Sequence, residues 1–283
     1  MSKLKAGSSP QNEVIVSAEV KQSFFEKYVK SDVVYNILVL AVALGLWTII
    51  AKMANSIFIP APIDVWHAFV NLIRVGDVEG YRLIDHMYKS IVRILAGFGL
   101  ACLIGIPLGL LLGIYPKVYA RSRALIEPIR FIPPIAWIPM AIVFLVGFQR
   151  YAFLIWLGAF FPIFINTLTS VPRVNPVYLN VAKVAGASRG FRIRKIIIPS
   201  VLPDIISGMR VGLGVAWMCI VAAEMIGGEA VGVGRLILKY AELLRMSEVI
   251  VGMLIIGIIG FTMNEVILRI EKKLFKWRWE VSL

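Results

Sequence analysis

The sequence is short of the residue types that build disulfide frameworks and metal centres. Its 283 residues include only two cysteines and two histidines. Cys102 and Cys219 each lie within an apolar run, where a free thiol behaves as a small hydrophobic side chain. His67 and His86 have no second ligand at metal-binding spacing, which favours ordinary placement at a membrane interface over a zinc or haem role. We therefore expect no disulfide, no metal and no cofactor.

The sequence also lacks a phosphate-binding loop. No Gly-x4-Gly-Lys-Ser/Thr segment is present, and a chain without one needs a separate protein to hydrolyse a nucleotide. An enzyme embedded in the membrane would need His, Asp, Glu or Ser-Lys groups gathered at one depth, and the apolar runs offer too few of them. We therefore expect a chain that is not an enzyme.

Charged residues are scarce relative to apolar ones. Apolar letters make up 59% of the sequence and the mean hydropathy is +0.83, whereas a soluble globule has about 45–50% apolar residues. The formal charge of +13 would suit a nucleic-acid binder, but the basic residues lie between long apolar runs and not on a soluble fold. A lipid bilayer is therefore the expected partner, and nucleic acid is not.

Six apolar runs are each about 20 residues long once flanking apolar positions are included, which is the length that spans a bilayer. They are residues 33–51, 91–114, 135–148, 151–171, 205–226 and 249–268. The third and fourth are separated only by Gln149 and Arg150, which predicts a tight antiparallel hairpin. The sequence thus predicts an all-α, polytopic membrane protein with six transmembrane helices.

Basic residues are distributed unevenly among the segments that join these runs. Most of the 30 lie in the amino-terminal segment, around Arg121, in residues 172–203 and near the carboxyl end. Because positive residues collect on the cytoplasmic side, both termini are predicted to be cytoplasmic. The expected organisation is a cytoplasmic tail (1–32), a first span with an outer loop (33–83), a membrane core (84–270) and a basic cytoplasmic tail (271–283).

The predicted outer segment 228–247 has an amphipathic pattern. Its apolar residues recur at helical spacing, namely Val233, Leu236, Ile237, Tyr240, Leu243 and Leu244. A short helix is expected there, either as a surface helix or as a gate.

The cytoplasmic connection between the fourth and fifth runs, residues 172–203, is long for a compact domain and such length usually marks function. Its apolar residues follow a helical period on both sides of Gly186, which predicts two short helices joined at that glycine. An isolated glycine and proline spacing would only indicate a shaped surface loop. The position between two spans favours a functional loop instead.

This connection resembles the EAA loop of ABC importer permeases. The motif of that loop is Glu-Ala-Ala, then three residues, Gly, nine residues and Ile-x-Leu-Pro. Four residues match it, namely Ala182, Gly186, Ile196 and Pro199, and three differ, namely Asn180, Val181 and Ile198. In that family the loop is a coupling helix that inserts into a groove of the ATPase subunit. The resemblance assigns this role to Asn180, Ala182, Lys183, Gly186, Ala187, Ser188, Phe191, Ile196 and Pro199. Asn180 replaces the acidic residue of the motif, so it can hydrogen-bond to the ATPase but cannot form an ion pair.

The resemblance covers roughly residues 84–277. Within the family, this part of the chain is similar to the nitrate, sulfonate, taurine and bicarbonate importer permeases. The stretches that carry it are 90–97 with Arg93, 105–109, 132–139, 158–162, 208–210, 222–224 and 232–234. It implies a type I ABC importer permease in the cell membrane that forms the path of a small solute, by family an oxyanion. A cytoplasmic ABC ATPase dimer, an extracytoplasmic solute-binding protein and a second copy of the chain are the implied partners, and a heterodimer stays open. The alternative is an ion-gradient-driven secondary transporter, which would show inverted repeats and paired mid-membrane charges.

Proline and glycine mark special positions in the spans. Pro133, Pro134 and Pro139 remove backbone donors at the start of the third run and predict a break or kink there. Freed carbonyls are tolerated where they line a watery cavity, so we expect these prolines to border the translocation path, with a packing kink as the alternative. Gly105 and Gly109 form a small-xxx-small pair that lets another helix approach closely.

The ionisable residues Arg93, Arg210 and Glu224 lie within the apolar runs, where a charge is costly. Arg93 begins its span and Glu224 ends its span on the outer side, so the two share a depth and are able to pair; snorkelling to the interface is the alternative. Arg210 lies fourteen residues before Glu224, about 21 Å along the helix and near the inner mouth. There it would either help a small anion leave or anchor to lipid phosphate.

Overall fold

The computed structural model describes residues 34–275, which are helices and their connections without a strand among them. Predictions about the two tails therefore lie largely outside the described residues. The chain divides into two compact units, residues 1–64 and 65–283. The described part of the first unit is the apolar helix Val34–Ala54 and the segment that follows it. Within it the indole N–H of Trp47 donates to the carbonyl of Pro60 at 3.1 Å, which holds the segment against the helix.

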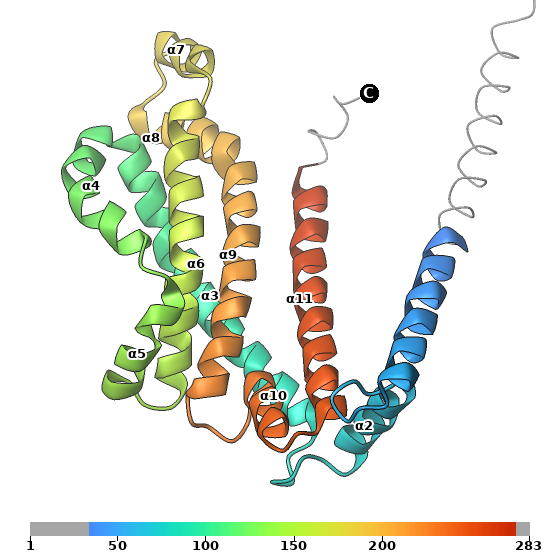
Figure 1. The fold of residues 1–283 in the computed structure, drawn as a ribbon. Coiled ribbons are helices and arrows are strands. Elements are labelled where there is room, and N and C mark those ends of the chain that lie inside the picture. Colours follow the sequence, from blue (N-terminus) through green and yellow to red (C-terminus); the bar gives the residue numbers. More distant parts are fainter. Residues whose placement is uncertain (1–33, 276–283) are drawn as a thin grey trace, which may run out of the picture. The chain divides into compact units, whose positions relative to one another are not determined.

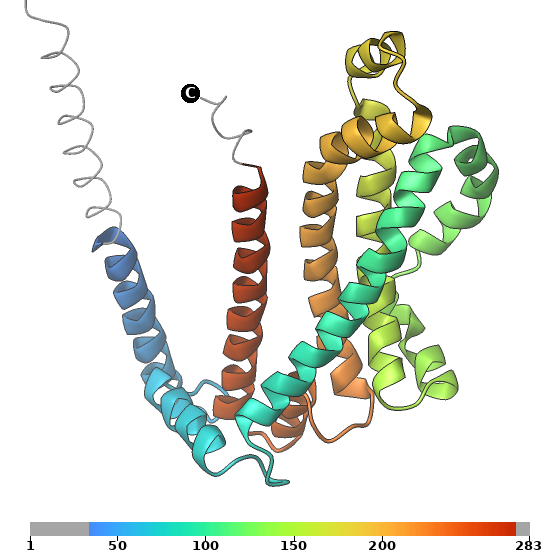
Figure 2. The same ribbon diagram turned by 180° about the vertical axis from the view of Figure 1, so that it is seen from behind.

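The second unit is a helical bundle, entered through α2 (Pro62–Arg74). Its further elements are α3 (Leu83–Ile114), α4 (Pro116–Arg130), η1 (Pro134–Trp137), α5 (Ile138–Phe144), α6 (Phe148–Ser170), η2 (Val171–Arg173), α7 (Pro176–Val184), α8 (Arg189–Arg192), the π-helical turn η3 (Ile193–Ile197), α9 (Ile198–Ile226), α10 (Val233–Glu242) and α11 (Met246–Leu274). Helices α6 and α9 lie side by side, with α7 and α8 at one end and α10 at the other (Figure 1). Figure 2 shows α3 crossing the bundle obliquely.

A stripe of small residues brings α3 against α6. Glycine or alanine recurs at every fourth position, at Gly97, Ala101, Gly105, Gly109 and Gly113. A Cβ added at position 109 would lie 2.7 Å from the Cβ of Thr167, so only glycine allows this approach of the two helices. At position 105 the nearest atom would lie at 3.4 Å, an ordinary contact distance. The predicted close packing at this pair is confirmed, with α6 as the partner helix.

Five of the described helices are long and apolar enough to span a membrane, and a sixth span is obtained if the bent pair α4 and α5 is counted as one. The third run, 135–148, is not one straight helix: the break predicted at its start is confirmed, because the seven-residue α5 belongs to a bent pair whose two parts meet at 81°. The physical cause is proline. Pro134 forces the preceding residue, Pro133, into an extended conformation with ψ at 134°. The two prolines also lack a backbone N–H, which removes two hydrogen-bond donors from the helix.

The fifth predicted span, 205–226, lies within a longer helix. That helix covers Arg189–Ile226, so it begins well before residue 205. The π-helical turn η3 leads directly into α9, and Pro199 falls in the first turn of α9, where its missing N–H is tolerated. The functional loop and the span are therefore joined without an interruption.

The stripe on α3 predicts a graded response to an added methyl group. Gly109→Ala is expected to destabilise the protein by about 1–3 kcal/mol, because the methyl would overlap Thr167 and the carbonyl oxygen of Phe164. The midpoint of thermal unfolding of the purified protein should fall accordingly. Gly99→Ala makes the same change on the same helix where no atom lies within 4 Å, so its midpoint should not fall. Equal losses from the two changes would contradict this packing.

Candidate functional site

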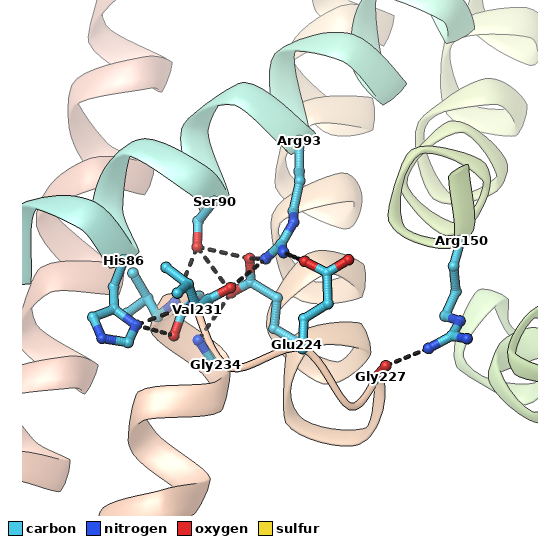
Figure 3. Close-up of polar contacts among 11 residues, drawn as sticks. His86, Ser90, Arg93, Arg150, Glu224, Gly227, Val231 and Gly234 are labelled. Carbon is cyan, nitrogen blue, oxygen red and sulfur yellow. Dashed lines mark hydrogen bonds and ion pairs between the residues drawn. The ribbon is translucent and has the colours of Figure 1, made fainter. Parts of the chain in front are cut away.

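Two charged residues that the sequence places at one depth are in direct contact. Arg93 of α3 and Glu224 of α9 form an ion pair, with Nη1 2.7 Å from Oε1 and with side chains only 2% and 1% exposed. The side chains point toward one another across the two helices (Figure 3). Arg93 therefore does not snorkel to an interface but is held inside the protein.

The Glu224 carboxylate is hydrogen-bonded on every side within the bundle. The hydroxyl of Ser90 lies 2.8 Å from both carboxylate oxygens, and the N–H of Gly234 donates to Oε2 at 3.0 Å. A Cβ at position 232 would lie 2.5 Å from the carboxyl carbon of Glu224. The glycines at 232 and 234 thus allow the backbone after α9 to reach a buried carboxylate.

Arg93 also holds the connection between α9 and α10. Its guanidinium donates to the carbonyl oxygen of Val231 at 2.9 Å, forms an ion pair with Glu229 and stacks over the ring of Tyr151 at 4.0 Å. A second arginine, Arg150 of α6, donates to the carbonyl oxygen of Gly227 in the same connection. We refer to Ser90, Arg93, Glu224 and Glu229 as the Arg93 cluster.

A second polar group lies beside this cluster. Lys239 of α10 binds the carboxylates of Asp77 and Glu79 at 2.7 and 3.0 Å, and His86 Nε2 lies 3.4 Å from Asp77. Burial alone would raise the pKa of Asp77, but hydrogen bonds from Lys239 and from the N–H groups of Tyr81 and Glu79 hold that pKa below its ordinary value. These contacts fasten the segment before α3 to α10.

His86 differs from its expected interfacial placement. Its side chain is fully buried, and Nδ1 lies 3.0 Å from both the N–H and the carbonyl oxygen of Gly232. No group of three or more potential metal ligands is found among residues 34–275. His86 is therefore part of the polar contacts that hold the connection before α10.

The coupling residues implied by the resemblance lie at the end of the bundle marked by α7 and α8 (Figure 1). Helix α7 ends in a Schellman turn, in which the N–H of Ala187 donates to the carbonyl of Ala182 and that of Gly186 to Lys183. Gly186 has φ +76°, the left-handed conformation that glycine adopts at this position. The predicted turn between two helices at Gly186 is confirmed, but the second helix is not short, because it continues from α8 through η3 into α9.

Helix α8, which follows Gly186, begins with an N-terminal cap of its own. The hydroxyl of Ser188 accepts a hydrogen bond from the N–H of Phe191 at 3.3 Å. Asn180 is exposed, and Ile196 and Pro199 line a groove at the base of α7. The segment therefore presents α7 and the start of the helix Arg189–Ile226, and its binding role stays a prediction.

The remaining predicted residues lie apart from these clusters. Pro133 lies in the break between α4 and α5, Pro134 begins η1 and Pro139 falls in the first turn of α5. Arg210 of α9 binds Glu271 of α11, with Nη1 3.2 Å from Oε2. That carboxylate partner was not expected, because it lies 61 residues away and no period in the sequence links the two helices.

The buried pair predicts strong energetic coupling. Arg93→Gln should destabilise the protein by about 3–5 kcal/mol, since it leaves the buried Glu224 carboxylate without a cationic partner, and Glu224→Gln should cost less, since Arg93 keeps Glu229. The double substitution should cost clearly less than the sum, as measured in a double-mutant cycle of unfolding midpoints. Glu229→Gln is the matched control, because it removes a carboxylate from the same arginine at a side chain that is 37% exposed, and its cost should be smaller. Strictly additive losses for Arg93 and Glu224 would show that the contact contributes no coupling.

Comparison with known proteins agrees with this geometry. Residues 105–277 match the family model described as the binding-protein-dependent transport system inner membrane component. The chain is 39% identical to a putative ABC transporter permease protein of Methanocaldococcus jannaschii, over 91% of this chain and 97% of that one. It is 32% identical to the taurine transport system permease protein TauC of Escherichia coli (89% and 92% covered) and to the nitrate import permease protein NrtB of Synechocystis sp. (82% and 86% covered).

The fold is shared with a solved transporter. A chain of the MetNI methionine ABC transporter, in an inward-facing conformation, superposes with a TM-score of 0.59 over 68% of this chain and 95% of that one, at 19% identity. The family model and the relatives together identify the chain, which belongs to the binding-protein-dependent inner membrane components and is the multi-pass permease of an ABC importer.

Proposed function

We propose that two copies of this chain form the translocation path of an importer, that a cytoplasmic ATPase dimer drives it by alternating access, and that an external binding protein delivers the solute. The observation that carries the proposal is the α7–Gly186–α8 segment at one end of the bundle (Figure 1). Its apolar side chains are turned to the exterior, with Val177, Val181 and Val184 exposed by 57%, 64% and 91%. An apolar helix face of this kind needs a protein partner in water.

The solute is proposed to be a small oxyanion. The relatives are named for taurine, aliphatic sulfonates and nitrate, and each of these solutes has a negative charge that is shared by oxygen atoms. The break between α4 and α5 supports a path next to these helices, because interrupted backbone within a membrane is tolerated where it faces protein or a watery cavity.

Both termini are proposed to be cytoplasmic, and α7 and α8 are proposed to be cytoplasmic as well. The carboxyl end of α11 and the α7–α8 segment lie at the same side of the second unit, and α10 lies at the opposite side (Figure 1). The basic residues of the α7–α8 segment, including Lys183, Arg189 and Arg192, agree with a cytoplasmic position.

Gly186 gives the sharpest test of coupling. Gly186→Val should destroy the Schellman turn, because a β-branched residue at φ +76° is strained, and should redirect α8 away from its docking position. Insertion into the membrane should be unaffected, while co-purification of the ATPase and solute-dependent transport should fall at least tenfold.

Gly190→Val is the matched control, because Gly190 lies within α8 without a positive φ and with no atom within 4 Å of an added Cβ. It should retain ATPase binding within about a factor of two, as should Arg189→Ala, in which the exposed Arg189 side chain is removed. A Gly186→Val protein that binds its ATPase and transports like the unaltered chain would remove the central support for this mechanism.

The topology is tested with reporter fusions. Alkaline phosphatase, which is active only outside the cytoplasm, should be active when fused after Arg245 and silent when fused after Leu274. A fluorescent protein that folds only in the cytoplasm should show the reverse pattern. Activity of the phosphatase after Leu274 would place the carboxyl end outside and overturn the assignment.

A further inference from the structure

A groove opens at the break between α4 and α5, against α6 and α9, with a volume of about 370 Å³. This volume is sufficient for a small organic ligand. Of its twelve lining residues, Arg130 is the sole ionisable one and Asn166 the sole amide, while the others are apolar or glycine. A single cationic group at an apolar wall favours an anion that also has an apolar part.

Arg130 is not saturated by the protein around it. Its Nε lies 3.2 Å from Oε2 of Glu127 and its guanidinium carbon lies 4.8 Å from the ring centre of Phe131, so the Glu127 contact engages only one of its three nitrogens. Glu127 also lies 3.8 Å from Arg123, so one carboxylate is shared by two guanidinium groups. The groove therefore keeps a net positive charge.

Asn166 adds a second polar group in the same wall. One N–H of its amide donates to the carbonyl oxygen of Pro162 at 2.8 Å, within its own helix. The amide has two N–H groups, so the second is able to donate to a bound oxygen atom. Arg130 and Asn166 come from different helices, α4 and α6, and both line the groove.

The depth of the groove fits a translocation path. The break that contributes Arg130 and Pro134 lies about halfway along α6 (Figure 1), and the lining residues of α6 extend from Leu157 to Asn166. Charged residues at such depth are costly and face protein or a watery cavity. Val211 and Val215 of α9 complete the wall, so the helix that starts at the coupling segment borders the groove.

We propose that this groove is the solute-contact site of the permease and that it takes a small alkyl sulfonate. The planar guanidinium of Arg130 is suited to two sulfonate oxygens at once, and the apolar wall with Phe131 and Phe161 accommodates the alkyl part. Nitrate has no apolar part and gains nothing from that wall. The proposal rests on the proposed function and specifies its substrate class.

Direct binding to the permease–ATPase complex tests the site. The complex is placed in nanodiscs of zwitterionic phosphatidylcholine, so that anionic lipid headgroups do not compete, and is titrated with ethanesulfonate, butanesulfonate and nitrate. Saturable binding of at least one sulfonate is expected, at least tenfold tighter than nitrate. Arg130→Gln should weaken that binding at least tenfold, and Arg130→Lys, which keeps the charge without the planar fork, should have an intermediate effect.

Arg123→Gln is the matched control. It removes the same charge from the same helix and the same Glu127 partner, but its side chain is 68% exposed and does not line the groove. Its sulfonate affinity should stay within twofold of the unaltered complex. Phe161→Ala should reduce the difference between butanesulfonate and ethanesulfonate, because it removes part of the apolar wall.

Three results would overturn the proposal: no sulfonate binds, Arg130→Gln binds as tightly as the unaltered complex, or nitrate binds as well as the sulfonates. In the second case Arg130 would be an anchor for lipid phosphate. Failure of the proposed function would give a different result. The chain would then not co-purify with its ATPase, whether or not a sulfonate binds to it.

Discussion

The ion pair between Arg93 and Glu224 sets the geometry of one whole end of the bundle. Both side chains are almost fully buried, and an unpaired charge in such a place would be strongly destabilising. The two helices that contribute them must therefore keep one register. The connection after α9 must also return to Glu224, because the N–H of Gly234 supplies one of its hydrogen bonds. The position of α10 follows from these contacts and from the bond between Lys239 and Asp77.

Close packing along α3 transmits this constraint through the membrane. Gly97 lies one turn after Arg93, and the small residues that follow at every fourth position, Ala101 and then three glycines, keep the backbones of α3 and α6 in contact as far as Gly113. Since lipid provides no hydrophobic force between helices, this contact depends on dispersion between closely fitted surfaces. The ion pair thus joins α3 to α9 at one end, and the small-residue stripe joins α3 to α6 along its length, so both constraints act on α3.

The sequence was informative wherever a local rule or a helical period applied. The rise of a helix turns sequence position into depth, which is why Arg93 and Glu224 could be matched before their contact was known. Gly186 could be recognised because a helix end favours glycine at that position. Glu229 and Asp77 could not be found in this way, because they lie in connections that have no period.

Proline was the least reliable signal. Pro133 and Pro134 break a helix as expected, but the sequence does not reveal the 81° between its two parts or the groove that places Arg130 beside α6. Pro199, by contrast, does not end a helix, because a π-helical turn precedes it and the chain continues to Ile226. The outcome depends on the neighbouring backbone, which a residue-by-residue rule does not include.

This uninterrupted helix has a mechanical consequence. At 1.5 Å per residue, the 29 residues of α9 extend over about 44 Å and lead from the coupling segment to Glu224. A helix held only at its ends would bend, but α9 is packed along α6 through residues such as Leu213 and Ile220. A displacement of α8 is then taken up in the π-helical turn or moves α9 as one body. In the second case the groove wall at Val211 and Val215 moves together with one partner of the buried ion pair.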